Sequence, residues 1–548
     1  MQMKPDGKLK WICYIVDHFS RFHTIYPQIK NTMNTSFVRR IKRTPYEMSV
    51  SNQTTISTKL GFFNLRNLTV SLITLVFITL LYLTNQGSKY YTNNIVLPLY
   101  HPKMLIFHPN ITPIINSSKT YTLPVNVPPQ SCWKRSFQEL LEPCKDSLSW
   151  TSRITDINLK TNLALSKIDT YFGPAGKTSF VKISTYDNMN RKKRRGGDSW
   201  WVTVTESISF HVVMFDNLDG SYTGWFDFVQ PGTYDVRIDL KYSLCDGYRD
   251  PPVWWFKVGT DHGKYQKPGV LGGQKDFMHQ SKKFTVTISG NKSIGDPNNI
   301  DNAYINDDCG YWIGGNNYVS KKRTFGPIKT HKRDGTIWFY GDSLQVRYEN
   351  YFGGRPLCTQ YFRCSVTYTW LYPNPHPSRK IYDNKDFDKN IPLNDIKAVL
   401  NNPVMKKNTS VLFVNWGLHV VLDLPFDVLK DFFQSFLTIV KELKQASPDA
   451  FPQIIWKSTT PTYEREYYDR NSGGSNAEAD HIRFLTKQRV MLWNAYSRDE
   501  VEKSGIKIVN FFHIAASYPP GPLDGLHFAG EVFESTAVAL EQYILSTV

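Results

Sequence analysis

The chain has 548 residues, of which 14% are aromatic and 21% charged, so it can build two or three folded domains and is not a low-complexity protein. Its formal charge of +17 suggests a nucleic-acid partner, but residues 1–66 hold eleven Lys or Arg against three Asp or Glu, a net +8. The remaining +9 is spread thinly over the rest of the chain, which argues against a dedicated nucleic-acid groove.

Residues 1–30 differ in character from the rest of the chain. The stretch KPDGKLKWICYIVDHFSRFHTIYPQ resembles a piece of the integrase core of retrotransposons. It covers none of the acidic residues that integrases use for metal-dependent strand transfer, so integrase activity does not carry over. We expect a fused or mispredicted exon, with Met33 or Met48 as a conventional start, and the alternative is an ordinary cytosolic tail.

Residues 68–84, LTVSLITLVFITLLYLT, form an uncharged apolar run of seventeen. As a helix this run would rise about 26 Å, near the lower limit for spanning a bilayer. Basic residues precede it, including RRIKR at 39–43, so we predict a signal anchor with residues 1–67 as a cytosolic tail and the rest in the lumen. A cleaved signal peptide, which would release a secreted protein, is the closest alternative, and a buried core helix is another.

The cysteines agree with a luminal, oxidising location. Cys13 precedes the apolar run, and the six disulfide candidates after it are Cys132, Cys144, Cys245, Cys309, Cys358 and Cys364. The close pairs Cys132/Cys144 and Cys358/Cys364 are the natural local pairings among fifteen connectivities, and no zinc-ligand spacing occurs. Glycosylation sequons begin at Asn110, Asn116, Asn291 and Asn408.

Three regions come after the apolar run. Residues 85–145, rich in Pro, Asn, Ser and Thr, are typical of a stem. Residues 146–295 contain short β-type runs, such as SWWVTVTES and TYDVRIDL, between Gly, Asp and Asn turns, which predict an antiparallel immunoglobulin-like sandwich. In residues 305–548 the apolar runs TIWFY, VLFV, QIIW and IKIVN alternate with helical stretches, which predicts an α/β domain with a mainly parallel sheet.

Chemistry-bearing residues come after three of these predicted strands. Gly341-Asp342-Ser343 comes after TIWFY, Asn415-Trp416-Gly417-Leu418-His419 after VLFV, and Asp524 and His527 lie in a Pro/Gly-rich loop before the last helix. Ligands bind beyond the carboxyl ends of such strands. We expect Asp524 to orient His527, which would take the proton of Ser343, while Asn415 and the N–H groups of Ser343 and Gly417 would stabilise an oxyanion.

Each of these motifs alone has an ordinary explanation. A serine or asparagine at a strand end is commonly a cap or turn former, and a single loop histidine is seldom a catalyst. Their conjunction at three strand ends is the feature that favours a catalytic serine.

From about residue 85 to its end, the chain resembles the NXPE family, which pairs a neurexophilin-like immunoglobulin-type domain with a PC-esterase domain of the SGNH-hydrolase fold. The matching residues are GDS at 341–343, NWGLH at 415–419 and DGLH at 524–527, with YDNMNRKKRRGGD and DNLDGSYTGWF in the sandwich. This resemblance implies Ser343 as nucleophile and Asp524 and His527 as its partners, with the NWGLH segment, His419 included, on the substrate side.

The chain departs from the family pattern at one position. Related PC-esterase proteins usually carry an arginine three residues after the serine, where this chain has Val346, and Arg347 comes one residue later. On a helix this shift turns the side chain by about 100° from the direction of the family's arginine, and Arg347 is the oxyanion candidate that remains on this helix. Gly353 and Gly354 are the candidates for the glycine of the second SGNH motif.

Three functions remain open from the sequence. The resemblance favours a Golgi O-acetyltransferase that moves an acetyl group to a glycan or glycoprotein, with no bound cofactor and a donor such as acetyl-CoA. A non-catalytic, neurexophilin-type protein that binds a protein ligand through the sandwich is the second, and a carbohydrate esterase the third. No nucleic-acid partner is expected, and the sequence leaves the oligomeric state, donor and sugar undefined.

Overall fold

The computed structural model describes residues 135–149, 156–251, 280–291, 303–306, 310–319, 325–369, 387–463 and 484–548. All of them belong to the second of two compact units, which spans 116–548. The predicted tail, the anchor at 68–84, Asn110, Asn116, Cys132 and Cys309 lie outside the described residues. Within the described part, no helix has the length and apolar character that crossing a bilayer requires.

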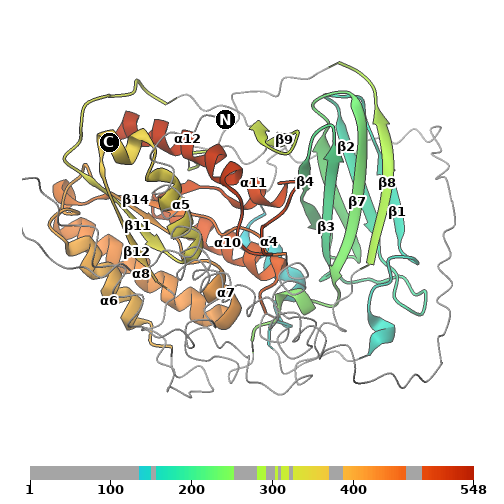
Figure 1. Ribbon diagram of the computed structural model, residues 1–548. Coiled ribbons are helices and arrows are strands. Elements are labelled where there is room, and N and C mark those ends of the chain that lie inside the picture. Colours follow the sequence, from blue (N-terminus) through green and yellow to red (C-terminus); the bar gives the residue numbers. More distant parts are fainter. Residues whose placement is uncertain are drawn as a thin grey trace, which may run out of the picture. The chain divides into compact units, whose positions relative to one another are not determined.

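The first eight strands of the described residues form two antiparallel four-stranded sheets, drawn from teal to yellow-green in Figure 1. The first sheet has the order β1-β2-β6-β5 and the second β4-β3-β7-β8. Their strands are β1 (Lys167–Tyr171), β2 (Thr178–Ser184), β3 (Ser199–Glu206), β4 (Phe210–Val212), β5 (Met214–Asp216), β6 (Ser221–Asp227), β7 (Gly232–Tyr242) and β8 (Gln280–Ile288). The continuous run SFHVVMFD supplies β4 to one sheet and β5 to the other.

Alternation of side chains explains why these strands form a sandwich. Successive residues of a strand point to opposite faces, so Val202 and Val204 of β3 face the same way as each other. They pack with Val181, Val236 and Ile238 in one buried cluster between the sheets. The antiparallel sandwich agrees with the sequence prediction, while its immunoglobulin type stays a prediction.

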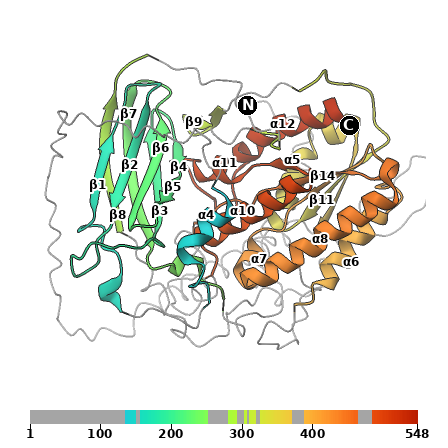
Figure 2. The same cartoon turned by 180° about the vertical axis from the view of Figure 1, so that it is seen from behind.

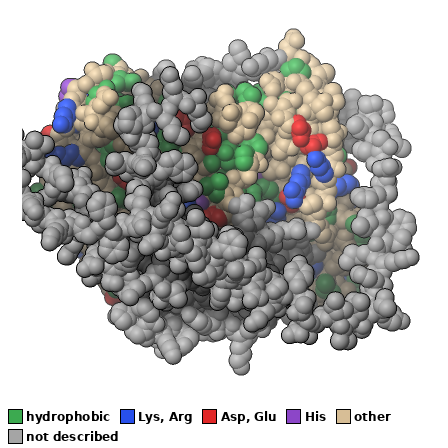
Figure 3. Space-filling model, in the orientation of Figure 1, with side chains coloured by type: hydrophobic (Ala, Val, Ile, Leu, Met, Phe, Trp, Pro, Cys, Tyr) green, Lys and Arg blue, Asp and Glu red, His purple; other side chains and the backbone are tan. Residues whose placement is uncertain are grey.

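Outside this cluster, charged side chains of β7 and β8 form ion pairs. Lys283 of β8 lies 2.6 Å from Asp235 of β7, and Arg237 lies 2.9 Å from Asp239. Figure 3 shows acidic and basic side chains together over this region.

The second part of the described chain, the α/β part that follows the sandwich, contains a five-stranded sheet. Its strand order is β12-β11-β13-β14-β15, and all the pairings are parallel. The strands are β11 (Thr336–Gly341), β12 (Arg363–Tyr368), β13 (Val411–Val414), β14 (Gln453–Lys457) and β15 (Lys507–Val509). The predicted parallel sheet is therefore confirmed. The sequence did not indicate β12, because this edge strand is partly exposed and its residues RCSVTY have no apolar run.

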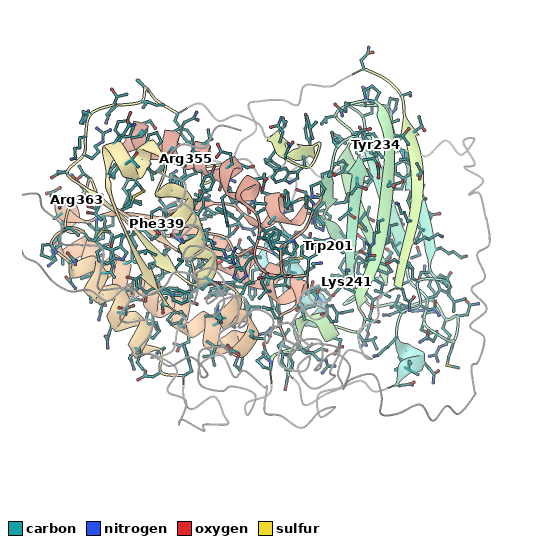
Figure 4. All side chains as sticks on the ribbon, in the orientation of Figure 1. Trp201, Tyr234, Lys241, Phe339, Arg355 and Arg363 are labelled. Atoms are coloured by element: carbon teal, nitrogen blue, oxygen red, sulfur yellow. A yellow bond between two sulfur atoms is a disulfide. The ribbon has the colours of Figure 1, made fainter. Side chains whose placement is uncertain are left out.

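Helices cover both faces of this sheet (Figures 1 and 2). They are α5 (Ser343–Phe352), α6 (Asn390–Asn401), α7 (Leu418–Asp423), α8 (Phe426–Ala446), α10 (Lys487–Lys503), α11 (Phe512–Ala516) and α12 (Gly530–Thr547). One core cluster joins α6, α7, α8 and α10 to the sheet, and another joins α5 and α12 to the opposite face. In Figure 4, Phe339 of β11 lies in this second part, where it packs in the cluster beneath α5.

The end of the predicted stem is ordered. Residues Phe137–Leu141 form α4, which begins with a capping box between Ser136 and Glu139. Phe137 stacks on Phe426 at 5.3 Å between ring centres, and its N–H donates to Asp499. A short hairpin, β9 (Tyr311–Ile313) and β10 (Asn317–Val319), bridges to the sandwich through Trp312 and Ser209.

The disulfides correct one of the two local pairings. Cys358 pairs with Cys364 as predicted, but Cys144 pairs with Cys245, 101 residues away, at a Cα–Cα distance of 5.5 Å. Proximity in sequence suggested Cys132 for Cys144, whereas the fold brings the end of β7 to the segment after α4. A Cα–Cα distance near 5.5 Å is what a disulfide requires.

Candidate functional site

Ser343 lies where β11 turns into α5, at the carboxyl edge of the parallel sheet. Asp342 is the N-cap of α5, and its Oδ1 accepts the N–H of Leu344 at 3.0 Å. Gly341 makes the turn feasible, because a Cβ there would lie 2.5 Å from the carbonyl oxygen of Asn415. The strand, the tight turn and the cap together present Ser343 as the first residue of the helix.

The loop before α12 holds Asp524 and His527 in a fixed relation. The Oδ1 of Asp524 accepts the backbone N–H of His527 at 2.8 Å and that of Leu526 at 3.0 Å. Gly525 between them has φ +90°, a conformation that favours glycine. The Asp-x-x-His spacing therefore closes a small turn in which the carboxylate lies beside the imidazole.

The three side chains form a continuous hydrogen-bonded series. His527 Nδ1 is 2.7 Å from Asp524 Oδ2, and His527 Nε2 is 2.9 Å from Ser343 Oγ, although 184 residues separate the histidine and serine in the chain. A carboxylate at Nδ1 selects the tautomer that carries its proton there. The lone pair of Nε2 is then free to accept the hydroxyl proton of Ser343.

The electrostatics of the loop keep this carboxylate ionised. Burial raises the pKa of Asp524. Hydrogen bonds from the ring and the backbone N–H of His527 and from the backbone N–H of Leu526 lower the pKa by more than burial raises it, so the pKa lies well below its usual range. The side chains of His527 and Asp524 are 19% and 37% exposed. The series is therefore open to solvent at one side.

The predicted oxyanion donors divide into two groups. Among the described residues, the backbone N–H groups of Ser343 and Gly417 make no hydrogen bond, as expected for N–H groups at helix starts. The Asn415 amide differs, because its Nδ2 donates to the carbonyl oxygen of Lys457 at 2.7 Å and to Thr459 Oγ1 at 3.3 Å. These two contacts occupy both amide hydrogens, so the predicted role of Asn415 as an oxyanion donor is not supported.

The remaining site candidates from the sequence are Arg347, His419, Gly353 and Gly354. Arg347 is exposed on α5, and no hydrogen bond or ion pair from it to another described residue is present. His419 is half-buried in the first turn of α7. Gly353 is the C-cap of α5, and with Gly354 it lies about 15 Å along the helix from Ser343, so neither supplies the second-motif glycine beside the serine. The asparagines of two predicted sequons, Asn291 and Asn408, are exposed.

The site includes a residue that the sequence motifs did not point to. Lys457, the last residue of β14, is only 1% exposed, and its Nζ lies 5.0 Å from the centre of the Phe511 ring. A charged residue directly at the end of the apolar run QIIW was the available signal. In the described residues, no group of three His, Cys, Asp or Glu side chains could hold a metal ion.

No protein-family model and no curated protein matches the sequence. Solved structures resemble part of it. A GDSL-like lipase from Bacteroides thetaiotaomicron is 12% identical over 39% of this chain and 90% of its own, with a TM-score of 0.26. A lipopolysaccharide acetyltransferase periplasmic domain from Salmonella Paratyphi A is 16% identical over 39% and 84%, with a TM-score of 0.25. A mutant acetyl-xylooligosaccharide esterase from Geobacillus is 14% identical over 39% and 96%, with a TM-score of 0.22.

Proposed function

We propose that this chain is an SGNH-type O-acyltransferase, with Ser343 as nucleophile, His527 as general base and Asp524 as the carboxylate that orients it. The observation that carries the proposal is the pair of contacts at His527, 2.9 Å to Ser343 Oγ and 2.7 Å to Asp524 Oδ2. A serine hydroxyl is a weak nucleophile until a base within hydrogen-bond reach accepts its proton. Both distances lie in the range that proton transfer requires.

The geometry supports a two-step transfer. Ser343 Oγ attacks the acyl carbonyl of a donor such as a thioester, and its proton passes to His527 Nε2. The donor's leaving group departs with that proton and leaves an acyl-serine. A sugar hydroxyl then gives its proton to His527, attacks the acyl carbonyl and releases Ser343 as the free alcohol.

Two backbone groups are suited to the charge that develops on the carbonyl oxygen. The N–H of Ser343 and that of Gly417 lie at the carboxyl edge of the sheet and have no protein partner among the described residues. A donor that waits unpaired in a fixed position stabilises a transition-state oxyanion without reorganisation. We assign the oxyanion role to them in place of Asn415 and Arg347.

Purified full-length protein given an acetyl donor and sialylated or other glycan acceptors tests this proposal. We expect acetylated glycan from the unaltered chain and a loss of about 10³-fold or more in rate for Ser343→Ala. Ser535→Ala is the matched control, because Ser535 lies on α12 and its hydroxyl bonds the Glu531 carbonyl in the same helix. Equal product from the unaltered chain and Ser343→Ala would exclude the serine mechanism.

Hydrolysis is the second candidate, and the exposure of the site favours it. Because the Asp524 side chain is 37% exposed, water can reach the loop. The same three residues would then pass the acyl group to water, as in a carbohydrate esterase. Release of acetate in the absence of any sugar acceptor would choose hydrolysis over transfer. If neither reaction occurs, the non-catalytic, ligand-binding function becomes the better account.

The family and the location belong to this proposal as well. The motifs GDS, NWGLH and DGLH, together with the antiparallel sandwich that precedes them, support membership of the NXPE family. The same resemblance supports a glycan acceptor and a type II Golgi membrane protein anchored by residues 68–84. Protease protection of sealed microsomes tests the topology, because the sandwich and the α/β part should both be protected.

A further inference from the structure

Lys457 lies in an unusual place for a lysine. As the last residue of β14 it alternates with Trp456, so its side chain shares the face of Ile455, which packs in the cluster under α5 and α12. It is 1% exposed, with its Nζ over the ring of Phe511. Lysine is almost never fully buried unless its charge is compensated. The compensating group has to come from the same part of the fold.

Asp342 is the charged group that meets this need. The register pairs Tyr340 with Val414 and Val414 with Trp456, so Asp342 and Lys457 follow at the same carboxyl edge of the sheet, two strands apart. Asp342 is 4% exposed, and its negative charge acts on Lys457. Its Oδ1 caps α5, while its Oδ2 is buried without a hydrogen-bond partner among the described residues. Gln345, in the first turn of the same helix, also has a buried Oε1 without a partner there. Two buried oxygen atoms of this turn therefore lack donors, and no hydrogen bond from Lys457 Nζ is present, within the part of the chain that the structure describes.

Uncompensated, the Asp342 carboxylate would oppose catalysis at the next residue. The oxyanion proposed above forms against the N–H of Ser343, which follows Asp342 directly in the chain. Two negative charges this close repel each other strongly where water is excluded. A buried cation that attracts the Asp342 carboxylate reduces that repulsion.

We propose that Lys457 is the buried counter-ion of Asp342 and thereby a positioning residue for Ser343. This inference rests on the proposed function. Because Lys457 is only 1% exposed, it would act through Asp342 and the first turn of α5 and not by contact with the acyl group. No ion pair within 4.0 Å joins the two described side chains, so the attraction between them acts over a longer distance.

Burial supplies a pH signature for the proposal. Desolvation lowers the pKa of Lys457 to about 8, and the charge of Asp342 opposes this fall. No other charged group acts noticeably on Lys457 among the described residues, and Phe511 beside it is uncharged. Lys457 is therefore charged below about pH 8 and neutral above it.

The kinetic test compares kcat/KM of the full chain and of Lys457→Met from pH 6 to pH 10. We expect the variant to be about tenfold slower at pH 7 through kcat, with KM unchanged, a smaller loss than removal of a direct oxyanion donor. Above pH 8 the ratio of the two rates should approach one, because the unaltered lysine is then neutral too. A ratio that stays constant with pH, or a change in KM alone, would overturn the proposal.

Lys457→Arg covers the case in which the methionine variant does not fold. Arginine keeps its charge over this whole range. Its rate should therefore fall less than that of the unaltered chain between pH 8 and pH 10. An identical alkaline decline in both proteins would contradict the assignment.

A stability measurement separates this inference from the proposed function. The melting temperature is measured for Lys457→Met, Asp342→Asn and the double variant, with Lys193→Met as control, since Lys193 pairs with Asp198 in the sandwich. We expect Asp342→Asn to lower the melting temperature less in the Lys457→Met background than in the unaltered chain. In the Lys193→Met background the losses in melting temperature from the two substitutions should simply add. If the losses in melting temperature from Asp342→Asn and Lys457→Met add strictly, Lys457 is not the counter-ion of Asp342. If the losses are not additive but the unaltered chain has no acyl-transfer activity, only the proposed function is contradicted.

Discussion

Asp524 is joined to His527 by two separate contacts, one through the backbone N–H and one through the ring. The ring contact fixes the tautomer, so its loss alters chemistry as well as position. We expect Asp524→Asn to lower kcat of acyl transfer by about 10³- to 10⁴-fold, because an amide can stabilise the wrong tautomer. Steady-state kinetics measures this loss, and near-normal kcat would show that the loop carboxylate is not part of the mechanism.

The same substitution has a stability signature that depends on pH. The pKa of Asp524 is depressed in the folded state, so its stabilising contribution is fully present above the unfolded value of about 3.9 and is lost as the pH falls below it. The melting temperatures of the unaltered chain and Asp524→Asn should therefore differ at pH 6 and converge in strong acid. A difference that grows on acidification would contradict this sign.

Gly341 allows the chain to pass close to its neighbouring strand. A Cβ at this position would lie 2.5 Å from a backbone oxygen of Asn415, which cannot move away as a flexible side chain could. We expect Gly341→Ala to cost about 1–3 kcal/mol of unfolding free energy. Gly354→Ala is the matched control, because nothing lies within 4 Å of its Cβ position. Equal denaturation midpoints for the two variants would refute the steric account.

At the scale of elements, α5 carries Ser343 at one end and is fastened to α12 along its length. The hydroxyls of Tyr348 and Thr536 lie 3.0 Å apart, and both residues are fully buried. At the far end, Arg355, labelled in Figure 4, lies 2.7 Å from Glu534 and 2.6 Å from Glu541 of α12. The helix is thus held at its middle and its end, while its first turn faces the site.

We expect Tyr348→Phe to lower the unfolding free energy by about 1 kcal/mol, the usual contribution of one hydrogen bond. The loss stays modest because the Thr536 hydroxyl still contacts the carbonyl of Phe533. Urea denaturation measures it, and acyl transfer should be almost unchanged at temperatures where the variant is folded. Additive losses in the Tyr348→Phe, Thr536→Val double variant would indicate that the two hydroxyls are not coupled.

The sequence allowed the elements with strong patterns to be predicted. The runs TIWFY, VLFV and QIIW became β11, β13 and β14, because strands buried on both faces are continuously apolar. In α8 the buried residues Leu429, Phe432 and Phe436 recur at the 3.6-residue spacing that is typical of an amphipathic helix. The edge strand β12 and the short helix α4 carry no such pattern and depend on contacts with distant segments.

The site was predictable in the same uneven way. Ser343, Asp524 and His527 were selected because their residue types are informative at strand ends, and the structure brings them together. Asn415 was selected for the same reason, but its amide hydrogens are occupied by Lys457 and Thr459. Whether a polar group is free is a property of the tertiary structure. Local sequence therefore cannot decide it.

At the scale of the whole molecule, the sandwich and the α/β part contact each other through polar and covalent links. Arg489 of α10 donates to Asp250 at 2.6 Å and to the carbonyl of Arg249 at 3.0 Å, in the segment after β7. Cys144, which follows the helix α4 that packs on α10, is joined to Cys245 at the end of the sandwich. These links connect segments that lie far apart in the chain.

The two disulfides should therefore contribute unequally to stability. Loop closure restricts the unfolded chain more when the loop is longer, by about 4.7 kcal/mol for the separation of 101 residues and about 2 kcal/mol for the separation of six. We expect Cys144→Ala/Cys245→Ala to lower the melting temperature clearly more than Cys358→Ala/Cys364→Ala, measured on the oxidised full chain. The second pair is the internal control for the chemistry of removing a disulfide. A larger loss from the short loop would mean that native packing around Cys358, and not unfolded-chain entropy, dominates.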